Sequence, residues 1–459
     1  MTVVCLLIAL LCWGTFSQSH VWARDTLSDV LREKGMISKE DWTRIQAAEE
    51  KKAEEAQKNL AEQFPVKAGW GKKGFTLETL DGDWKTAIQW RFQSRYTYSQ
   101  RTDADSFSDF NNDKESTFEL RRVRMKIGGH GYAPWIKYYF EVDWQPTRNS
   151  GDDASQSGVR LLDWRIDLSK WKWLQLRVGQ WKINYNRERV DSSGKQQFVE
   201  RSIVTNAFTV DRQVGAMVYG HLAPGTLLDS RYYAGVWNGS GRGEANDDAN
   251  MMYMGRWQWN FLGRDLKWQQ SDSTYHQQPA GSAAFAVYTT IGKCTRWSSS
   301  GCGTLGFSNS AGLPFTKDSA ATDGQFRVQG MMEEFAFKWR GLSIQHEYHW
   351  KEVKDNSFPE GTGGYKTNLM GSYAQIGYFP HYLIPGIPQP LEVAFRYAFV
   401  DPNVSAKNDK LSAYTIAINW FFAGHRNKLT LDGTWFTLAQ PVGKDLNEQQ
   451  VRLQWDVSF

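Results

Sequence analysis

The nine residues Val451–Phe459 alternate between apolar and polar side chains without interruption. In an extended strand, successive side chains point to opposite faces, so Leu453 and Trp455 share one face while Arg452 and Gln454 share the other. A strand of this length and pattern fits one crossing of a closed transmembrane barrel, with its apolar face towards lipid and its polar face towards a wet lumen.

The same alternation recurs from Trp84 to the end of the chain. The apolar set of side chains runs through the segments 88–92, 123–127, 138–144, 162–168, 174–178, 335–339, 391–397 and 414–420. Charged residues almost never occupy these apolar positions. His346 is the one exception on an outward-facing position of a strand. That is the pattern a lipid-facing wall requires, because a Lys or Arg at the bilayer midplane costs about 2–4 kcal/mol.

The connections between these segments alternate in length. Short turns are expected at 128–134, 169–172, 261–265, 341 and 424–427, and long polar loops at 100–116, 145–158, 186–210, 238–250, 279–324, 356–369, 401–410 and 440–448. In outer-membrane barrels the short turns face the periplasm and the long loops face outside. Such barrels have an even number of strands, and the count is even if one strand lies between Asp265 and Ile291. The sequence therefore predicts an all-β fold: a transmembrane antiparallel β-barrel of about 16 strands.

Composition agrees with a barrel and excludes two other classes. After the first two dozen residues, no apolar run is long enough for a membrane helix, and alternation explains the mean hydropathy of −0.57. The 22 Trp and 19 Tyr suit two aromatic belts at the membrane interfaces. A net charge of +4 without any nucleic-acid motif argues against a nucleic-acid partner. Neither a cofactor nor a metal site is implied.

The N-terminal part differs in kind from the rest. Residues 1–23 are predicted to be a secretory signal peptide. Residues 24–75 are expected to form a periplasmic helical extension with a Gly/Lys linker at 69–74, and residues 76–459 are expected to form the barrel. Ser38, with Asp41 three residues later, predicts the N-cap of a charged helix from Lys39 to about Leu60. This helix is either a solvated spacer or a contact at a trimer axis.

Two of the four cysteines, Cys5 and Cys12, lie in the leader. Cys294 and Cys302 lie in a Gly/Ser-rich stretch that is expected to be an outside loop. In an oxidising compartment this second pair can close a small loop disulfide. A metal pair is disfavoured because no His or carboxylate cluster sits beside them.

The loop 186–210 follows the fifth predicted strand and is rich in charge. Its charged residues are Arg187, Glu188, Arg189, Asp191, Lys195, Glu200 and Arg201, and Arg212 begins the next strand. In general porins the third long loop folds into the lumen and narrows it, and this loop holds that position. Cations in a narrow throat attract anions, whereas a charge-balanced loop held by its own ion pairs is the alternative. Arg201 and Arg212 are the favoured anion-attracting residues.

The polar faces of the strands carry slightly more basic than acidic residues. The basic ones include Arg91, Arg95, Lys126, Lys137, Arg165, Arg177, Arg256, Lys338, Arg340, Arg396 and Arg452. The acidic ones include Glu141, Asp143, Asp163, Asp167, Glu334, Glu347, Glu392, Asp432 and Asp456. Many of them can form ion pairs that stiffen the wall, so the charges alone support only a mild anion preference.

Three blocks in the same order resemble the phosphate-selective porin O and P family: 178–182, 198–202 and 211–215, with sequences VGQWK, FVERS and DRQVG. The segment LRRVR at 120–124 is similar to that family's early arginine-rich strand. The resemblance implies a trimeric outer-membrane channel for phosphate, polyphosphate or other anions. The family-pattern positions it carries over are Lys182, Glu200, Arg201 and Arg212, with Arg122 and Arg124 as lumen-facing basic residues.

Departures from the family are Trp181 in place of Phe, and Ile183-Asn184 where Pro-Phe is usual. The last strand, which ends at Phe459, resembles the terminal strand that the barrel-assembly machinery reads. Besides small anions, the expected partners are therefore this machinery, outer-membrane lipid and two further copies of the chain.

An enzyme in the membrane is the rival class. It needs a nucleophile beside a base, but no Gly-x-Ser-x-Gly elbow occurs, and His346 and His349 point to opposite faces of a strand. The sequence therefore predicts an outer-membrane porin that passes small anions and is not an enzyme. A non-selective general porin is the alternative, followed by a surface scaffold or adhesin that uses the loop 279–324.

Overall fold

The structure is a computed structural model that describes residues 27–63, 66–71, 74–100, 114–144, 159–246, 248–299 and 301–459. The expected signal peptide, 1–23, lies outside the described residues, as do Cys5, Cys12 and most of the first two long loops. The chain divides into two compact units, Met1–Val66 and Lys67–Phe459, which are described separately.

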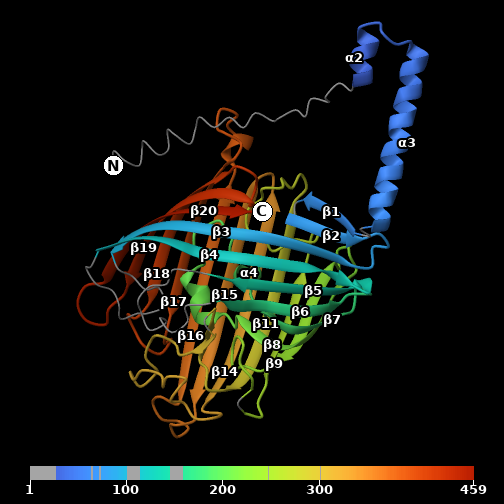
Figure 1. Cartoon of the computed structure of the whole chain (residues 1–459). Coiled ribbons are helices and arrows are strands. Elements are labelled where there is room, and N and C mark those ends of the chain that lie inside the picture. The colour runs from blue at the N-terminus through green and yellow to red at the C-terminus, as the bar shows by residue number, and fades with distance from the viewer. Residues whose placement is uncertain are drawn as a thin grey trace. The chain divides into compact units, whose positions relative to one another are not determined.

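The N-terminal unit contains two helices, α2 (Leu27–Glu33) and α3 (Lys39–Gln63) (Figure 1). The Ser38 hydroxyl accepts a 3.1 Å hydrogen bond from the Asp41 backbone N–H, which is the predicted N-cap. The two helices are tied together by the Trp42 indole N–H, which donates to Asp29 over 2.9 Å. The predicted charged helix is thus confirmed. Among the described helices, none combines the length and the apolar character needed to span a membrane.

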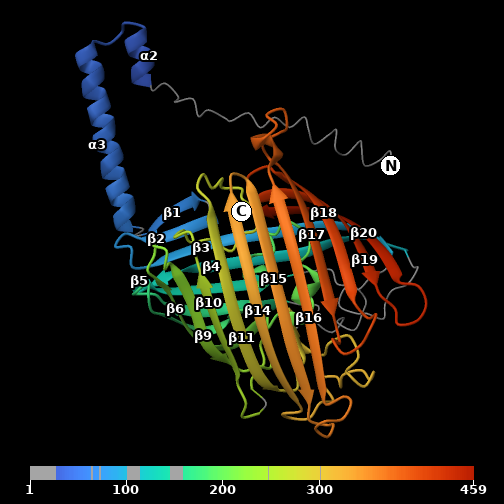
Figure 2. The same cartoon turned by 180° about the vertical axis from the view of Figure 1, so that it is seen from behind.

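The second unit is built from antiparallel strands (Figures 1 and 2). In chain order they are β1 (Val66–Gly71), β2 (Gly74–Thr79), β3 (Lys85–Gln100), β4 (Lys114–Gly131), β5 (Ala133–Asp143), β6 (Arg160–Leu168), β7 (Gln175–Lys182), β8 (Arg212–Leu222), β9 (Ser230–Trp237), β10 (Met252–Trp259), β11 (Ala280–Gly292), β12 (Arg296–Ser298), β13 (Gly301–Gly303), β14 (Phe326–Trp339), β15 (Leu342–Asp355), β16 (Lys366–Tyr378), β17 (Leu391–Asp401), β18 (Leu411–Phe421), β19 (Asn427–Leu438) and β20 (Leu446–Ser458).

The barrel closes where β20 pairs with β3, with Ser458 opposite Arg91. Of the 18 strands in the main sheet of the described residues, β1 and β2 form a hairpin beside the start of β3, and the other 16 close the barrel. The predicted strand number is therefore confirmed. The expected linker at 69–74 needs correction in its described part, because residues 69–71 belong to β1, which pairs with β2, and Gly74 begins β2.

The connections gather at two rims. The turn rim holds the end of β20 and the connections that follow β4, β6, β8, β10, β14, β16 and β18, and the loop rim holds the others. One strand, β11, lies between Asp265 and Ile291, as the parity required. The long loop expected at 279–324 needs correction, since β11 occupies its first part. The short turn expected at 261–265 is instead a 260–279 connection, in which Gln270 and Ser271 are buried.

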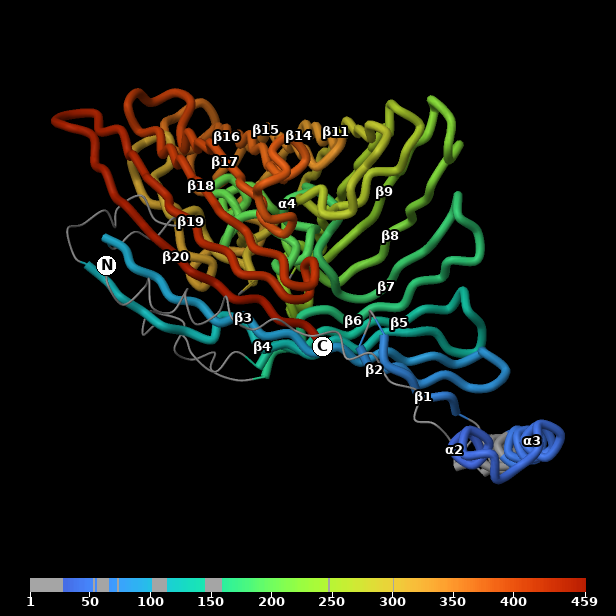
Figure 3. The backbone as a smooth tube through the Cα atoms, turned by 90° about the horizontal axis from the view of Figure 1, so that it is seen from above, coloured from blue at the N-terminus to red at the C-terminus, as the bar shows by residue number. Residues whose placement is uncertain are grey.

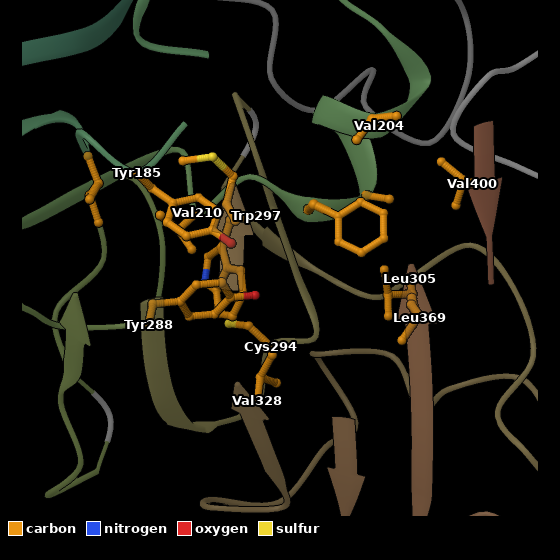
Figure 4. Close-up of a cluster of buried hydrophobic side chains, with 14 of the residues drawn as sticks. Tyr185, Val204, Val210, Tyr288, Cys294, Trp297, Leu305, Val328, Leu369 and Val400 are labelled. Atoms are coloured by element: carbon orange, nitrogen blue, oxygen red, sulfur yellow. The ribbon is translucent and has the colours of Figure 1, made fainter. Parts of the chain in front are cut away.

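Part of the lumen is filled by apolar side chains (Figure 4). Tyr185, Val204 and Val210, from the segment between β7 and β8, belong to a buried cluster with Tyr288 of β11 and Trp297 of β12. Inward-facing apolar residues of β8–β10 and β14–β19 complete it. Part of the barrel interior is therefore packed, and charged side chains lie against this packing, as Lys351 does against Trp297.

Candidate functional site

The constriction loop, residues 183–211 between β7 and β8, lies inside the ring of strands (Figure 3). It contains two short helices, α4 (Arg187–Val190) and α5 (Ile203–Phe208). The loop reaches the far wall, where the Val199 backbone N–H donates to Asp432 of β19 over 2.9 Å. Lys428 of the same strand donates to the Gln196 carbonyl over 2.5 Å. The loop therefore crosses the lumen rather than covering its mouth.

One anchor of the loop is a buried ion triad. Arg187 Nε donates to Glu334 Oε1 on β14 over 2.7 Å, and Arg256 of β10 donates to both Glu334 oxygens over 2.9 Å. All three side chains are at most 1% exposed. Since a buried carboxylate needs partners of this kind, the triad fixes α4 to the wall.

A second anchor is the carboxylate of Glu188, which organises the loop from within. It accepts hydrogen bonds from the Ser202 backbone N–H (2.9 Å), the Ser202 hydroxyl (2.6 Å) and the Thr205 hydroxyl (2.6 Å). Arg396 of β17 pairs with it over 3.2 Å. Glu188 thereby joins α4, the start of α5 and the barrel wall in one network.

A basic cavity of about 270 Å³ lies between the constriction loop and the inner wall of β17–β20, β3 and β4. Among the described residues that line it, the charged ones are Arg95, Arg121, Arg201, Arg396, Arg452 and Glu200. Five guanidinium groups and one carboxylate thus line a confined space, and two of the five, those of Arg396 and Arg452, are paired with Glu188 and Asp432 beside it. An enclosed cluster of this sign attracts anions and repels cations.

Arg201 contributes a cation that is not paired with a carboxylate among the described residues. Its guanidinium donates to two main-chain oxygens, those of Glu188 (2.8 Å) and Asp191 (2.7 Å). Burial, and then the charge of Arg189, lower the pKa of Arg201 to about 10, so the side chain stays charged at neutral pH. The loop therefore holds this guanidinium in place without neutralising it.

Glu200 is the carboxylate of the cavity. Its Oε1 lies 2.6 Å from Arg95 and 3.1 Å from Arg121, and its Oε2 lies 3.4 Å from Arg122. Burial would raise the pKa of Glu200, but the charges of Arg122, Arg95 and Arg121 outweigh it and hold that pKa well below its usual range. Glu200 is therefore ionised at neutral pH.

Other expected site residues are neutralised. Arg212 is buried and donates to Asp163 over 2.5 Å, and Arg189 pairs with Asp211. Arg124 pairs with Glu141 and Asp143 on the neighbouring strand. These pairs, like the Arg187 triad, correspond to the alternative in which ion pairs hold the loop and wall together.

Two expected lysines differ from one another. Lys182 donates to the Asp191 carbonyl over 3.2 Å, whereas Lys195 is exposed and forms no ion pair within the described residues. The structure thus brings Glu200, Arg201 and Arg122 together, and it places Arg212, Arg189 and Arg187 in separate structural contacts.

Arg121 is a cavity residue that the sequence did not single out. Strict alternation would turn it away from its neighbour Arg122, but the β3–β4 register shifts by one residue between Gln93 and Ser94. This bulge lets Arg121 and Arg122 both reach Glu200. The available signal is the pair of consecutive arginines, which breaks the alternation.

Cys294 and Cys302 form a disulfide with 5.5 Å between their Cα atoms. It closes the β12–β13 hairpin, whose Trp297 is buried and donates to the Gly239 carbonyl over 2.7 Å. Ser299 of the same hairpin accepts a 2.8 Å hydrogen bond from Arg189 of the constriction loop. The disulfide therefore supports a hairpin that rests on the constriction loop.

Replacing Cys294 and Cys302 by alanine should destabilise this hairpin locally by about 2–3 kcal/mol, because a short covalent loop is lost. Amide hydrogen exchange should then accelerate in residues 294–303, while the amides of β17–β20 keep their protection. Unchanged exchange in 294–303 would mean that packing of Trp297 alone holds the hairpin.

A family match and the structure of a solved porin agree with this architecture. The family described as Phosphate-selective porin O and P matches residues 94–432. An anion-selective porin from Comamonas acidovorans has a similar structure, with a TM-score of 0.53 and 10% identity over 82% of this chain and 99% of that one. The outer-membrane channel DcaP of Acinetobacter baumannii reaches a TM-score of 0.48 at 13% identity, over 83% and 99% of the two chains. A search of the curated proteins found no match.

Proposed function

Since the chain belongs to the phosphate-selective porin O and P family and is an outer-membrane porin, we propose that it passes small anions, phosphate or polyphosphate among them, through a lumen narrowed by the constriction loop. The family and the barrel fold favour a channel over an enzyme. The solved porin from Comamonas acidovorans is described as anion-selective, which agrees with this proposal.

The observation that carries the proposal is the basic cavity. Among the described residues, five arginines and one carboxylate line it. Arg396 and Arg452 are paired with Glu188 and Asp432, whereas Arg201 presents a charge held by main-chain oxygens. Guanidinium groups suit oxyanions because they offer several N–H donors in a planar fork. Phosphate is therefore the first anion to test.

Replacing Arg201 by alanine should lower the chloride-over-potassium permeability ratio at least fivefold, since a unit charge at close range in a wet site is worth about 1 kcal/mol to the anion alone. The measurement is the reversal potential of the purified protein in a planar bilayer under a potassium chloride gradient. The wild type should be chloride-selective, and added phosphate should block its current.

The control removes a neutral ion pair from the barrel wall, between β8 and β6. Arg212→Ala combined with Asp163→Ala leaves the net charge of the lumen unchanged, so the permeability ratio should stay at the wild-type value. An unchanged ratio in Arg201→Ala would contradict the role of this arginine. A wild-type current without selectivity would mean a general porin, and the absence of current over repeated insertions would favour a surface scaffold.

The proposal also covers the membrane, the assembly and the oligomeric state of the channel. Outer-membrane lipid would surround the apolar outer face of the barrel, and the terminal strand β20 would be read by the barrel-assembly machinery during insertion. The family resemblance supports a homotrimer. The helices α2 and α3 would then form a periplasmic extension, after removal of a signal peptide.

A further inference from the structure

Glu200 differs from the other carboxylates that form ion pairs inside the barrel. Its side chain is 25% exposed, whereas Glu334 and Asp432 are 0% exposed and Asp143 is 2% exposed. The buried carboxylates are walled in by their partners and the protein. Glu200 instead borders the basic cavity, so that a molecule in the cavity can reach two of the guanidinium groups that contact Glu200, those of Arg95 and Arg121.

Two of the three guanidinium groups that contact Glu200 are also held from other directions. Arg95 Nε donates to Gln454 over 3.1 Å, and Arg122 donates to Gln93 over 2.9 Å. These bonds leave the arginines in position whether or not Glu200 occupies the space between them. The cluster is therefore preorganised to bind an anion.

The backbone on both sides of Glu200 is anchored by other residues. The Val199 N–H donates to Asp432, the Glu200 carbonyl accepts from Arg396 over 3.2 Å, and the Ser202 N–H donates to Glu188. None of these bonds uses the Glu200 carboxylate. That side chain can consequently turn away from the arginines while the constriction loop keeps its course.

We propose that the Glu200 carboxylate is a displaceable internal anion. It binds Arg95, Arg121 and Arg122 while no anion is passing, and a permeating anion must displace it from them. This inference rests on the proposed function. A carboxylate and a phosphate accept from guanidinium groups in the same bidentate manner, so the two compete for the same donors. A chloride ion offers a single charge and no fork, and it displaces Glu200 less well than a divalent oxyanion does.

The consequence is a limit on affinity. Three free guanidinium groups would hold a divalent anion tightly and slow its release, and conduction requires binding that is weak enough to leave. Competition by Glu200 lowers the net affinity of the cluster because each bound anion replaces a favourable ion pair. Glu200 thus sets both the preference among anions and their residence time.

Replacing Glu200 by glutamine keeps the shape and one acceptor but removes the charge. The concentration of phosphate that halves the chloride current should fall about tenfold or more, since the incoming anion no longer displaces a carboxylate. The individual blocking events should also lengthen. A purely structural role for Glu200 predicts the opposite, because a loosened loop would bind phosphate more weakly.

The matched control is Glu119→Gln, which removes a carboxylate from the same cluster at longer distances, 3.5 Å from Arg95 and 4.0 Å from Arg121. It should change the half-blocking concentration much less. If Glu200→Gln fails to insert, Glu200→Asp retains the charge on a shorter side chain and should tighten phosphate block to a smaller degree. Equal or weaker phosphate block in the variant that conducts would overturn the inference.

The two proposals fail in different ways. If the basic cavity does not select anions, the wild-type protein itself will show neither chloride selectivity nor phosphate block. If the cavity selects anions but Glu200 does not compete, the wild type will show both, and Glu200→Gln will leave the half-blocking concentration unchanged.

Discussion

Replacing Glu334 by alanine should lower the free energy of unfolding by about 3–5 kcal/mol, because it leaves two buried guanidinium groups without their shared carboxylate. Arg187 comes from the constriction loop and Arg256 from β10, and both are at most 1% exposed. Neither can turn towards water without disturbing the wall. The loss should appear in the urea-dependent unfolding of the protein folded in lipid vesicles, followed by tryptophan fluorescence.

The preceding residue supplies a matched control. Glu333 lies on the same strand but is exposed on the opposite face, so Glu333→Ala removes the same atoms without unpairing Arg187 or Arg256. Its unfolding midpoint should stay close to that of the wild type. Similar unfolding curves for the two variants would mean that other groups satisfy the two arginines.

The wall of the barrel could be predicted because its information is local. A strand needs only its own alternation to assign Arg452 to the inner face and Leu453 to the outer one. The Ser38 cap of α3 is equally local. The pairing of strands could not be predicted in the same way. Asp432 lies opposite Arg452 only in the β19–β20 register, and the sequence of each strand alone does not determine that register.

The position of the connection 260–279 inside the lumen could not be predicted from local sequence patterns. It carries no periodic pattern and contains no strand or helix, yet its Gln270 side chain accepts a 2.7 Å hydrogen bond from the Gln197 backbone N–H of the constriction loop. Ser271 donates to Glu392 of β17 over 2.9 Å. These contacts join distant parts of the chain inside the lumen, and they depend on the closed barrel.

The charges of the constriction loop allowed two interpretations, an anion-attracting throat or a loop held by ion pairs. The structure contains both arrangements, divided among residues of one type. Arg187 pairs with Glu334, which is 147 positions away along the chain. Within the part of the chain that the structure describes, Arg201 bonds only to main-chain oxygens of its own loop. Residue type alone does not separate these arginines. The family resemblance favoured Arg201 and Arg212 over Arg187, but Arg212 is paired with Asp163, and only the folded contacts show this.

Replacing Glu188 by alanine should release the constriction loop. The variant removes the acceptor for Ser202 and Thr205 and leaves the buried Arg396 without its carboxylate. Breaking a buried pair of this kind costs about 3–5 kcal/mol, and here the cost falls on the loop because Glu188 joins α4 to α5. Amide hydrogen exchange in residues 199–210 should accelerate accordingly.

The functional result should follow from the same loss. A loop that opens more often leaves a wider lumen, so the single-channel conductance of Glu188→Ala should rise while its chloride selectivity falls, because Arg201 loses its fixed place beside the Glu188 carbonyl. Lys195→Ala is the control, as it removes an exposed charge from the same loop without touching the network. It should leave both hydrogen exchange and conductance near the wild-type values. Conductance that stays at the wild-type level in Glu188→Ala, with normal protection of 199–210, would show that the wall contacts through Asp432 and Glu334 hold the loop closed without Glu188.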